Sequence, residues 1–421
     1  MIVRQERSPI ALLCLALLIA ACSKGPDSAP EAYEITVLES PAGADSLSPN
    51  LAVGPGGTVV MSWLEATVDA YLLQYAVFDG QTWGEARTVT SGGDWFVNWA
   101  DFPSVVPISD DLWAAHWLVR RDAGGYAYDI HAAFSEDAGN TWSEPFVPHT
   151  DNTDTEHGFV SMFPADGGVG MVWLDGRKFV NEYDENDVAA SGMTLRSGIF
   201  NPDATVVEGV LVDELICDCC QTDVAVTSEG PVAVYRDRTT EEIRDIYFAR
   251  NVDGSWQPGK PVANDGWEIP GCPVNGPVIQ ADGSLLSVAW FSASDNEPRV
   301  QVAWSQDAGR SMSAPVLVSD GGLLGHVGAA MLPGGDTVVS WLKSAAGNGE
   351  LHLRRVSPSG EAGPDVVVAE ATGVAAFSVP QLMRVGDGLL LAWTDASTEV
   401  SQVRTAMIPL QLLGEPGENG D

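Results

Sequence analysis

One pattern of hydrophobic and polar positions recurs along most of the chain. Each copy has a short strand-like run, a turn rich in glycine and proline, and then an apolar run with an aromatic residue near its end. Short apolar or alternating runs bounded by turn residues are typical of β-strands. The aromatic positions are Trp63, Trp117, Trp173, Tyr235, Trp290, Trp341 and Trp393, at intervals of 54, 56, 62, 55, 51 and 52 residues. Seven strand-rich repeats of this length predict a propeller or a solenoid.

Each repeat is long enough for four antiparallel strands, which make one propeller blade. The last repeat has no fourth strand before the acidic end of the chain. The segment from Tyr33 to Ser40 resembles the fourth strands of other repeats, so we expect it to pair with the last blade and close the ring. Closure removes exposed sheet edges. The pattern therefore predicts an all-β propeller of seven four-stranded blades over residues 32–411, followed by an acidic tail, residues 412–421.

The first residues read as a targeting segment. Two arginines precede an apolar run from Ile10 to Ala21, which is too short for a permanent membrane helix, so residues 1–21 are expected to be a signal peptide. Its end, Ile-Ala-Ala-Cys, resembles the lipobox of bacterial lipoproteins, which implies cleavage before Cys22 and lipidation of that residue. Ser23 in the next position implies the outer membrane. Residues 22–31, rich in Pro, Ser and Gly, are expected to be a flexible tether, with the protein facing the periplasm or the cell surface.

Charge limits the partners. The chain has 21 Lys and Arg against 58 Asp and Glu, a net charge of −37. A field of this sign repels polyphosphates and anionic headgroups, so we expect no nucleic-acid binding and membrane contact through the lipid anchor only. Envelope proteins remain possible partners.

Two segments resemble the Asp-box, S-x-D-x-G-x-T-W, of the sialidase-like propeller family. They begin at Ser135 and Ser305 and carry Asp137 and Asp307. The resemblance implies a tight turn in which the Asp side chain bonds the backbone, so these residues are expected to be structural. Most sialidases resemble six-bladed rings, which makes six blades the alternative to seven. The chain is also similar to a group of bacterial lipoproteins that share its CxCC, YRDR and GCPVNGP segments.

A cysteine group lies in the loops that enter two inner strands. Counting back from the aromatic positions aligns Cys217 with Cys272 of the next repeat, and brings His157 and His326 to equivalent rim positions. Four cysteines in an oxidising compartment predict two disulfides. The alternative is a copper or zinc site, because thiolates and imidazoles suit both ions. Its ligands would be Cys217, Cys219, Cys220 and Cys272 with His157 or His326.

The loops that leave the aromatic strands concentrate charge. Arginines bind carboxylates with two hydrogen bonds, and a nearby acid can transfer protons, as a glycosidase acting on an acidic sugar requires. Aromatic rings in neighbouring loops can stack on sugars. The candidate catalytic acids are Asp237, Glu241 and Asp175. The candidate ligand-binding residues are Arg177, Arg236, Arg238, Arg244, Trp95 and Trp267. Networks of Arg and Asp pairs that hold long loops are the structural alternative.

Three functions follow from these observations. The first is a sialidase-like lipoprotein that binds, and as an exo-sialidase-like glycoside hydrolase cleaves, a glycan or similar extracellular ligand. The Arg-Ile-Pro motif that carries the first sialidase arginine is not found in the chain, which argues against sialidase activity. The second is a periplasmic copper- or zinc-binding protein that uses the cysteines. The third is a scaffold without catalysis in an envelope complex.

Overall fold

The computed structural model describes residues 33–121, 125–165, 168–180, 188–203, 209–371 and 378–417. Residues Glu34–Asp421 form one compact unit. The expected signal peptide, the lipidation site Cys22 and the tether lie outside the described residues. None of the helices in the described ranges is long and apolar enough to cross a membrane.

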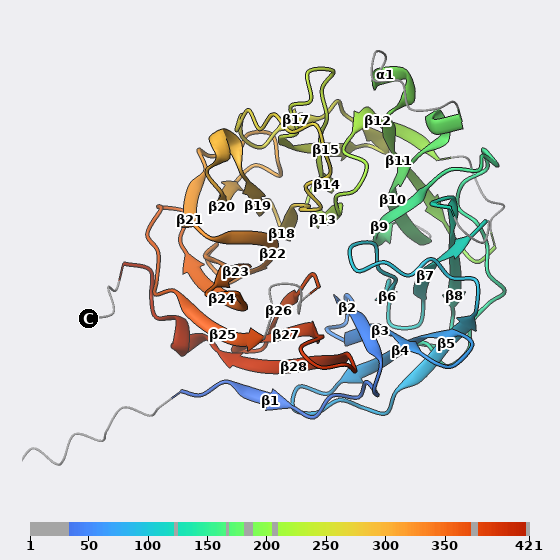
Figure 1. Ribbon diagram of the computed structural model, residues 1–421, viewed down its shortest axis with the longest axis horizontal. Helices are drawn as coiled ribbons and strands as arrows, with labels where there is room; N and C mark the ends of the chain where they lie inside the picture. Colours follow the sequence, from blue (N-terminus) through green and yellow to red (C-terminus); the bar gives the residue numbers. More distant parts are fainter. Residues whose placement is uncertain are drawn as a thin grey trace, which may run out of the picture. The chain divides into compact units, whose positions relative to one another are not determined.

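Seven antiparallel sheets stand around a central axis, each with its first strand innermost (Figure 1). This confirms the seven-bladed propeller. From the inner to the outer edge, blade 1 contains β2 Ser46–Val53, β3 Val59–Ala66, β4 Tyr71–Phe78 and β5 Arg87–Gly92, and blade 2 contains β6 Ser104–Pro107, β7 Trp113–Arg120 and β8 Tyr128–Ser135. In the same order, blade 3 contains β9 His157–Ala165, β10 Gly168–Asp175, β11 Met193–Phe200 and β12 Val210–Ile216, and blade 4 contains β13 Asp223–Thr227, β14 Gly230–Arg236 and β15 Ile246–Val252, with the short strands β16 Ser255–Trp256 and β17 Lys260–Pro261 both paired with β15. Blade 5 contains β18 Val278–Asp282, β19 Leu285–Ser292, β20 Arg299–Ser305 and β21 Val316–Asp320; blade 6 contains β22 Leu323–Met331, β23 Thr337–Ala345, β24 Asn348–Val356 and β25 Val366–Ala371; and blade 7 contains β26 Gln381–Val385, β27 Gly388–Asp395, β28 Gln402–Pro409 and β1 Thr36–Leu38. Four short helical turns complete the described structure: η1 Arg177–Val180, α1 Val188–Ser191, η2 Ser294–Asn296 and η3 Leu410–Leu413.

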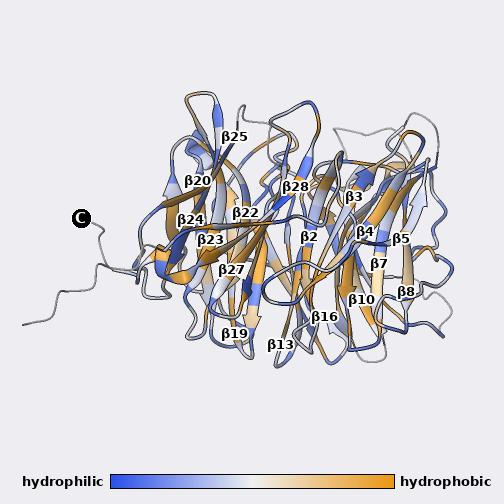
Figure 2. Cartoon of the chain, turned by 90° about the horizontal axis from the view of Figure 1, so that it is seen from below, coloured by the Kyte–Doolittle hydropathy of each residue, from blue (hydrophilic) through white to orange (hydrophobic). Residues whose placement is uncertain are grey.

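The repeated aromatic residue is the core anchor of each blade. All seven side chains are buried, with exposed fractions between 0% and 8%. They lie on the second strand of each sheet, where they pack between neighbouring blades. Apolar residues follow the strands while polar ones gather at the loops, as Figure 2 shows. The hydrophobic contact between blades therefore explains the spacing of the sequence repeat.

The ring closes through the predicted N-terminal strand. Thr36, Val37 and Leu38 of β1 pair with Met407, Ala406 and Thr405 of β28. The outer edge of blade 7 is thus covered by a strand from the other end of the chain. The last turn, η3, buries Leu413 completely, so packing continues past residue 411, where the acidic tail was expected to begin.

Blade 2 departs from the expected four strands. In the fourth position, the described residues form no strand: Phe146 makes an isolated bridge to the sheet, through two hydrogen bonds with Ala132 at 2.8 and 2.9 Å. Pro145 and Pro148 flank this residue. Proline has no N–H to donate to a ladder, so pairing stops after one residue.

The two turns predicted from the Asp-box resemblance have one hydrogen-bonding pattern. The Asp137 carboxylate accepts hydrogen bonds from the amide and hydroxyl of Thr141, at 2.8 and 2.7 Å, and from the hydroxyl of Ser135. Asp307 makes the same contacts with Ser311 and Ser305. Both carboxylates therefore accept these hydrogen bonds from within their own turn.

A central channel of about 730 Å³ runs along the axis. Residues from the inner strands of all seven blades line it. The loops that enter these strands surround one mouth of the channel, and they carry the cysteines.

Candidate functional site

Side-chain bridges tie the loops at this mouth together. Gln221 donates to the carbonyl of Ala100 at 2.8 Å and accepts from the amide of Gly276 at 3.0 Å, which links the loops entering blades 2, 4 and 5. A Cβ at Gly276 would lie 2.3 Å from the Gln221 carbonyl oxygen, so this approach requires glycine. Trp99 stacks on His326 with ring centroids 5.2 Å apart. These contacts hold the loops and side chains at the mouth in defined positions.

The four cysteines converge at this mouth. Cys217, Cys219 and Cys220 lie between β12 and β13, and the amide of Cys217 is fixed by the Arg236 carbonyl at the end of β14, at 3.0 Å. The Sγ of Cys217 lies 3.2 Å from that of Cys220 and 3.9 Å from that of Cys219. Cys272, from the loop before β18, is a neighbour of Cys219. The sequence alignment placed Cys217 opposite Cys272 in the neighbouring blade, and the structure has both residues in loops at the same mouth.

No disulfide joins these cysteines in the described structure. All four are free thiols, and the shortest Sγ–Sγ distance given above exceeds the length of a disulfide bond, about 2.05 Å. This differs from the expectation of two disulfides. The cause is geometric: the cysteines form a group with Cys217 in its centre, where three sulfur atoms share one small volume, rather than two separate pairs.

Positive charge beside Cys217 favours its thiolate. Burial opposes the anion, but hydrogen bonds from the Cys219 and Cys220 thiols and the charges of Arg244 and Arg236 hold the pKa of Cys217 well below its usual range. Arg244 also donates a hydrogen bond to the sulfur, through Nη1 at 3.3 Å. A hydrogen bond from Cys219 also lowers the pKa of Cys272. These neighbours therefore favour the thiolate form of Cys217 over the thiolate forms of ordinary buried cysteines.

The predicted ligand-binding arginines are engaged within the protein. Arg236 is 2% exposed and donates to the carbonyl groups of Asn275, Arg244 and Phe291. Arg238 and Arg244 both bind the carboxylates of Glu242 and Asp218. These contacts match the structural alternative, a network that holds the loops.

Arg177 lies apart from this network, on blade 3. Its Nε donates to Asp175 Oδ1 at 2.6 Å, and its Nη2 lies 3.3 Å from Asp151 Oδ1. Asp175 is completely buried and also accepts from the Trp173 indole, so its carboxylate is fully engaged.

The three candidate catalytic acids have different surroundings. Burial, followed by the charge of Asp213, raises the pKa of Asp237 to about 8. Glu241 is exposed at the tip of the same loop. Asp175 belongs to the blade 3 contacts described above. The structure therefore does not gather the three acids around one set of neighbours.

The candidate sugar-stacking tryptophans are buried. Trp95 is 6% and Trp267 is 7% exposed, and both pack in hydrophobic clusters. Arg236 covers the Trp267 ring at 4.9 Å. Trp99, which stacks on His326 at the mouth, is 44% exposed and offers an accessible aromatic ring there.

The two candidate histidines do not join the cysteines. His326 packs on Trp99, and its Nδ1 lies 3.1 Å from the Ser378 carbonyl. His157 stacks on His149, with ring centroids 3.8 Å apart, beside Asp151. Sequence reasoning missed His149. The segment from His149 to His157 carries two aspartates and a glutamate, which was an available signal, but His149 lies in a loop outside the repeat register.

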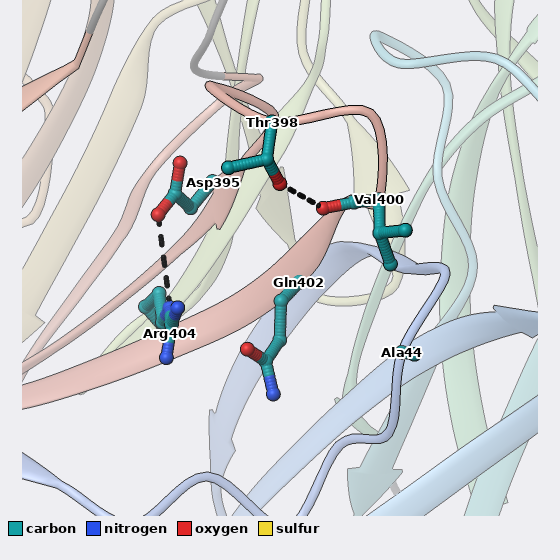
Figure 3. Close-up of a pocket in the computed structure, with 6 residues that line it drawn as sticks. All are labelled: Ala44, Asp395, Thr398, Val400, Gln402 and Arg404. Atoms are coloured by element: carbon teal, nitrogen blue, oxygen red, sulfur yellow. Dashed lines mark hydrogen bonds and ion pairs between the residues drawn. The ribbon is translucent and has the colours of Figure 1, made fainter.

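A small open pocket of about 190 Å³ lies beside blade 7 (Figure 3). Asp395 and Arg404 face each other in it at 3.7 Å, and Thr398 bonds the Val400 carbonyl at 2.7 Å. Its six lining residues include neither cysteine nor histidine. The cysteine group is thus the stronger candidate site.

Comparison with known proteins gives the fold class. No protein-family model matches the chain, and no curated protein matches it. Among solved structures, the chain is similar to an ulvan lyase bound to -[GlcA(1-4)Rha3S]-, with 10% identity, a TM-score of 0.52, and coverage of 90% of this chain and 94% of the lyase. It is also similar to a Penicillium chrysogenum α-L-arabinanase complexed with arabinobiose, with 13% identity, a TM-score of 0.49, and coverage of 89% and 98%.

A third neighbour is the Trypanosoma rangeli sialidase complexed with the inhibitor DANA, with 13% identity and a TM-score of 0.47. The match covers 78% of this chain and spans 57% of the sialidase chain. The likeness to the ulvan lyase, at 10% identity, shows a shared fold alone, and function has to be argued from the site.

Proposed function

We propose that this protein binds one thiophilic metal ion, Cu(I) or Zn(II), through Cys217, Cys219, Cys220 and Cys272. The observation that supports this most directly is the convergence of three free thiols, those of Cys217, Cys219 and Cys220, whose sulfur atoms lie within 4.8 Å of one another. Cys272, from the loop that enters the next blade, is a neighbour of Cys219 and would supply the fourth ligand. Loops at a propeller mouth are positioned by a rigid scaffold, and ligands on such loops form a defined site.

The donor set fits a tetrahedral thiolate site. In such a site a Zn–S distance of about 2.3 Å places the sulfur atoms about 3.8 Å from one another. The Cys217–Cys219 distance of 3.9 Å matches this value, and the Cys217–Cys220 distance of 3.2 Å requires a small outward movement of one side chain. Thiolates also select Cu(I), so both ions fit the donors.

The charges around the cysteines support binding of a metal ion by the thiolates rather than binding of a ligand that carries a carboxylate. Arg244 donates a hydrogen bond to Cys217, and its guanidinium group also pairs with the carboxylates of Asp218 and Glu242. The arginines thus neutralise the thiolates and leave little free positive charge for an acidic sugar. The four cysteines would hold the ion at the mouth of the channel, and because such a site has no open coordination position, the bound ion would supply a structural or carrier function.

We place this function in the bacterial envelope, with the protein anchored by lipid on Cys22. The resemblance of the first residues to a lipoprotein signal supports this placement. A metal-thiolate bond protects cysteines from oxidation, which gives the site a physical reason to be filled there.

An anaerobic titration tests the proposal. Reduced protein beginning at Ser23 receives Cu(I) or Zn(II) against a chromophoric competitor, and Co(II) serves as a probe of thiolate ligands by its charge-transfer absorption. We expect one equivalent to bind with thiolate absorption, to weaken in Cys272→Ser, and to be lost in the Cys217→Ser, Cys220→Ser double variant. Protein alkylated with N-ethylmaleimide is the control and must show no thiolate absorption. Failure of reduced wild-type protein to bind either ion with thiolate ligation would overturn the proposal.

Carbohydrate binding is the second candidate function. The solved ulvan lyase, which shares the propeller fold, is bound to a saccharide, and the exposed Trp99 offers a ring at the mouth of the channel. In this candidate function Asp237 is the proton donor, because its raised pKa keeps it protonated near neutral pH. Calorimetric titration with uronic-acid and arabinose oligosaccharides tests it. Binding that disappears in Trp99→Ala supports the candidate, and absence of heat with every sugar excludes it.

A further inference from the structure

The structure contains a second group of metal-ligating side chains, between blades 2 and 3. Asp129 lies on β8, His149 in the loop that follows Phe146, and His157 at the start of β9. One atom of each lies within 4.8 Å of the others. This group is separate from the cysteines, and its function does not depend on the proposed thiolate site.

Buried ring nitrogens without partners distinguish this group from an ordinary ion-pair network. Both histidine side chains are completely buried. Among the described residues, Nδ1 and Nε2 of His149 and Nδ1 of His157 form no hydrogen bond. A buried polar atom left unpaired costs about 1–3 kcal/mol, and most such atoms in proteins have a partner. Three in one place indicate that a ligand belongs there.

Distances identify the ligand as a cation. Asp129 Oδ1 lies 3.4 Å from His149 Nε2 and 3.9 Å from His157 Nδ1. These separations are long for hydrogen bonds, but a tetrahedral ion with bonds of about 2.0–2.1 Å holds its ligands about 3.4 Å apart. Two imidazoles and a carboxylate are a donor set for Zn(II) and other borderline divalent ions.

Charge around the histidines also favours a cation. On the described side chains, three carboxylates face the pair, those of Asp129, Asp151 and Asp175, and a fourth, that of Asp154, pairs with Arg121. Three positive charges oppose them, on Arg121, Arg177 and Arg196. With neutral rings, this leaves one negative charge. Arg121 holds the Asp129 carboxylate through Nε at 2.8 Å, and the Asp129 side chain is 15% exposed, which gives an ion a route from solvent.

We infer that Asp129, His149 and His157 form a binding site for a borderline divalent cation of the Zn(II) type. The two rings are now parallel, with an interplanar angle of 4°. Imidazole binds metal in the plane of its ring, and two parallel planes share no point, so at least one ring must rotate toward the ion. Binding therefore ends the stacking, which is a signature that can be measured.

Variants that lack the thiols isolate this site. With all four cysteines of the mouth replaced by Ser, the protein is titrated with Zn(II), and with Co(II) as a spectroscopic probe. We expect one equivalent of Co(II) to bind without thiolate charge-transfer absorption, and the ring signals of both histidines to shift in ¹⁵N NMR spectra on Zn(II) binding. His149→Gln should weaken binding at least tenfold, and Asp129→Asn, which conserves side-chain volume, should do the same.

His352→Gln is the matched control. His352 also lies between two carboxylates, but its ring nitrogens bond Asp365 at 2.6 Å and Glu350 at 3.0 Å, so no orphan nitrogen is present. This variant should bind Zn(II) as the parent does. Absence of Zn(II) binding by the folded cysteine-free protein, or unchanged affinity in both His149→Gln and Asp129→Asn, would overturn the inference. Neither result bears on the thiolate site, which the same background lacks.

Discussion

Replacing Arg244 with Gln should raise the pKa of Cys217. Gln keeps a hydrogen-bond donor near the sulfur but removes the positive charge, whose nearest atom lies 3.3 Å from Cys217 Sγ. A unit charge at this distance contributes about 5 kcal/mol at an effective dielectric constant near 20. Asp218 and Glu242 share the same guanidinium group and reduce its effect. The range for a hydrogen bond to a charged group, about 1.5–3 kcal/mol, is therefore the better guide, and it corresponds to about 1–2 pKa units.

The assay needs Cys217 as the sole cysteine, because coupled thiols titrate together. Ser at positions 219, 220 and 272 keeps hydroxyl donors in place of the thiols. The ¹³Cβ shift of Cys217 then reports its ionisation with pH, even though the side chain is buried. Arg250→Gln is the control, since Arg250 bonds the Ala308 carbonyl and Glu229, far from the cysteines in the chain. An unchanged pKa in Arg244→Gln, or an equal rise in Arg250→Gln, would refute the electrostatic reasoning.

Three further predictions concern stability. Burial raises the pKa of Asp237 to about 8, so the protonated form is favoured in the folded state and stability is lost as pH rises from about 4 through 8. Asp237→Asn should therefore match the wild type near pH 4 and exceed it by more than about 1 kcal/mol at pH 8 in urea unfolding, whereas a pH-independent difference would contradict this. Trp290→Ala should cost about 3–5 kcal/mol, because the ring is completely buried and its indole bonds Asp265 at 2.7 Å; a cost below about 1 kcal/mol in the same assay would show that the anchor is dispensable. Removing residues 34–38 should expose the edge of β28, lower the melting temperature and cause self-association in light scattering, and a stable monomer would argue against ring closure by β1.

The fold could be predicted from the sequence because each blade repeats one physical requirement. A large aromatic side chain, such as Trp173 or Trp341, fills the space between neighbouring sheets, and its recurrence gives the number of blades. Blade 2 was less regular than predicted, since Pro145 and Pro148 limit the pairing of its fourth position to one residue.

The site was predicted only in part. The repeat register placed Cys217 opposite Cys272, because both residues enter inner strands of adjacent blades. The register does not describe side-chain direction, so His326 was expected near the cysteines although it packs on Trp99. Arginine pairing was equally hidden, because the sequence does not show which carboxylates, here Glu242 and Asp218, fold back onto Arg238 and Arg244.

The most direct test of the proposed metal function is the native mass of the protein beginning at Ser23, isolated from the periplasm without reductant or chelator. One spectrum reports bound metal and the oxidation state of the four cysteines together. The account predicts a mass that includes a bound copper or zinc ion, and four thiols that become reactive to alkylation once the ion is removed. A mass that is short by two hydrogens for each of two disulfides, with no metal, would contradict it.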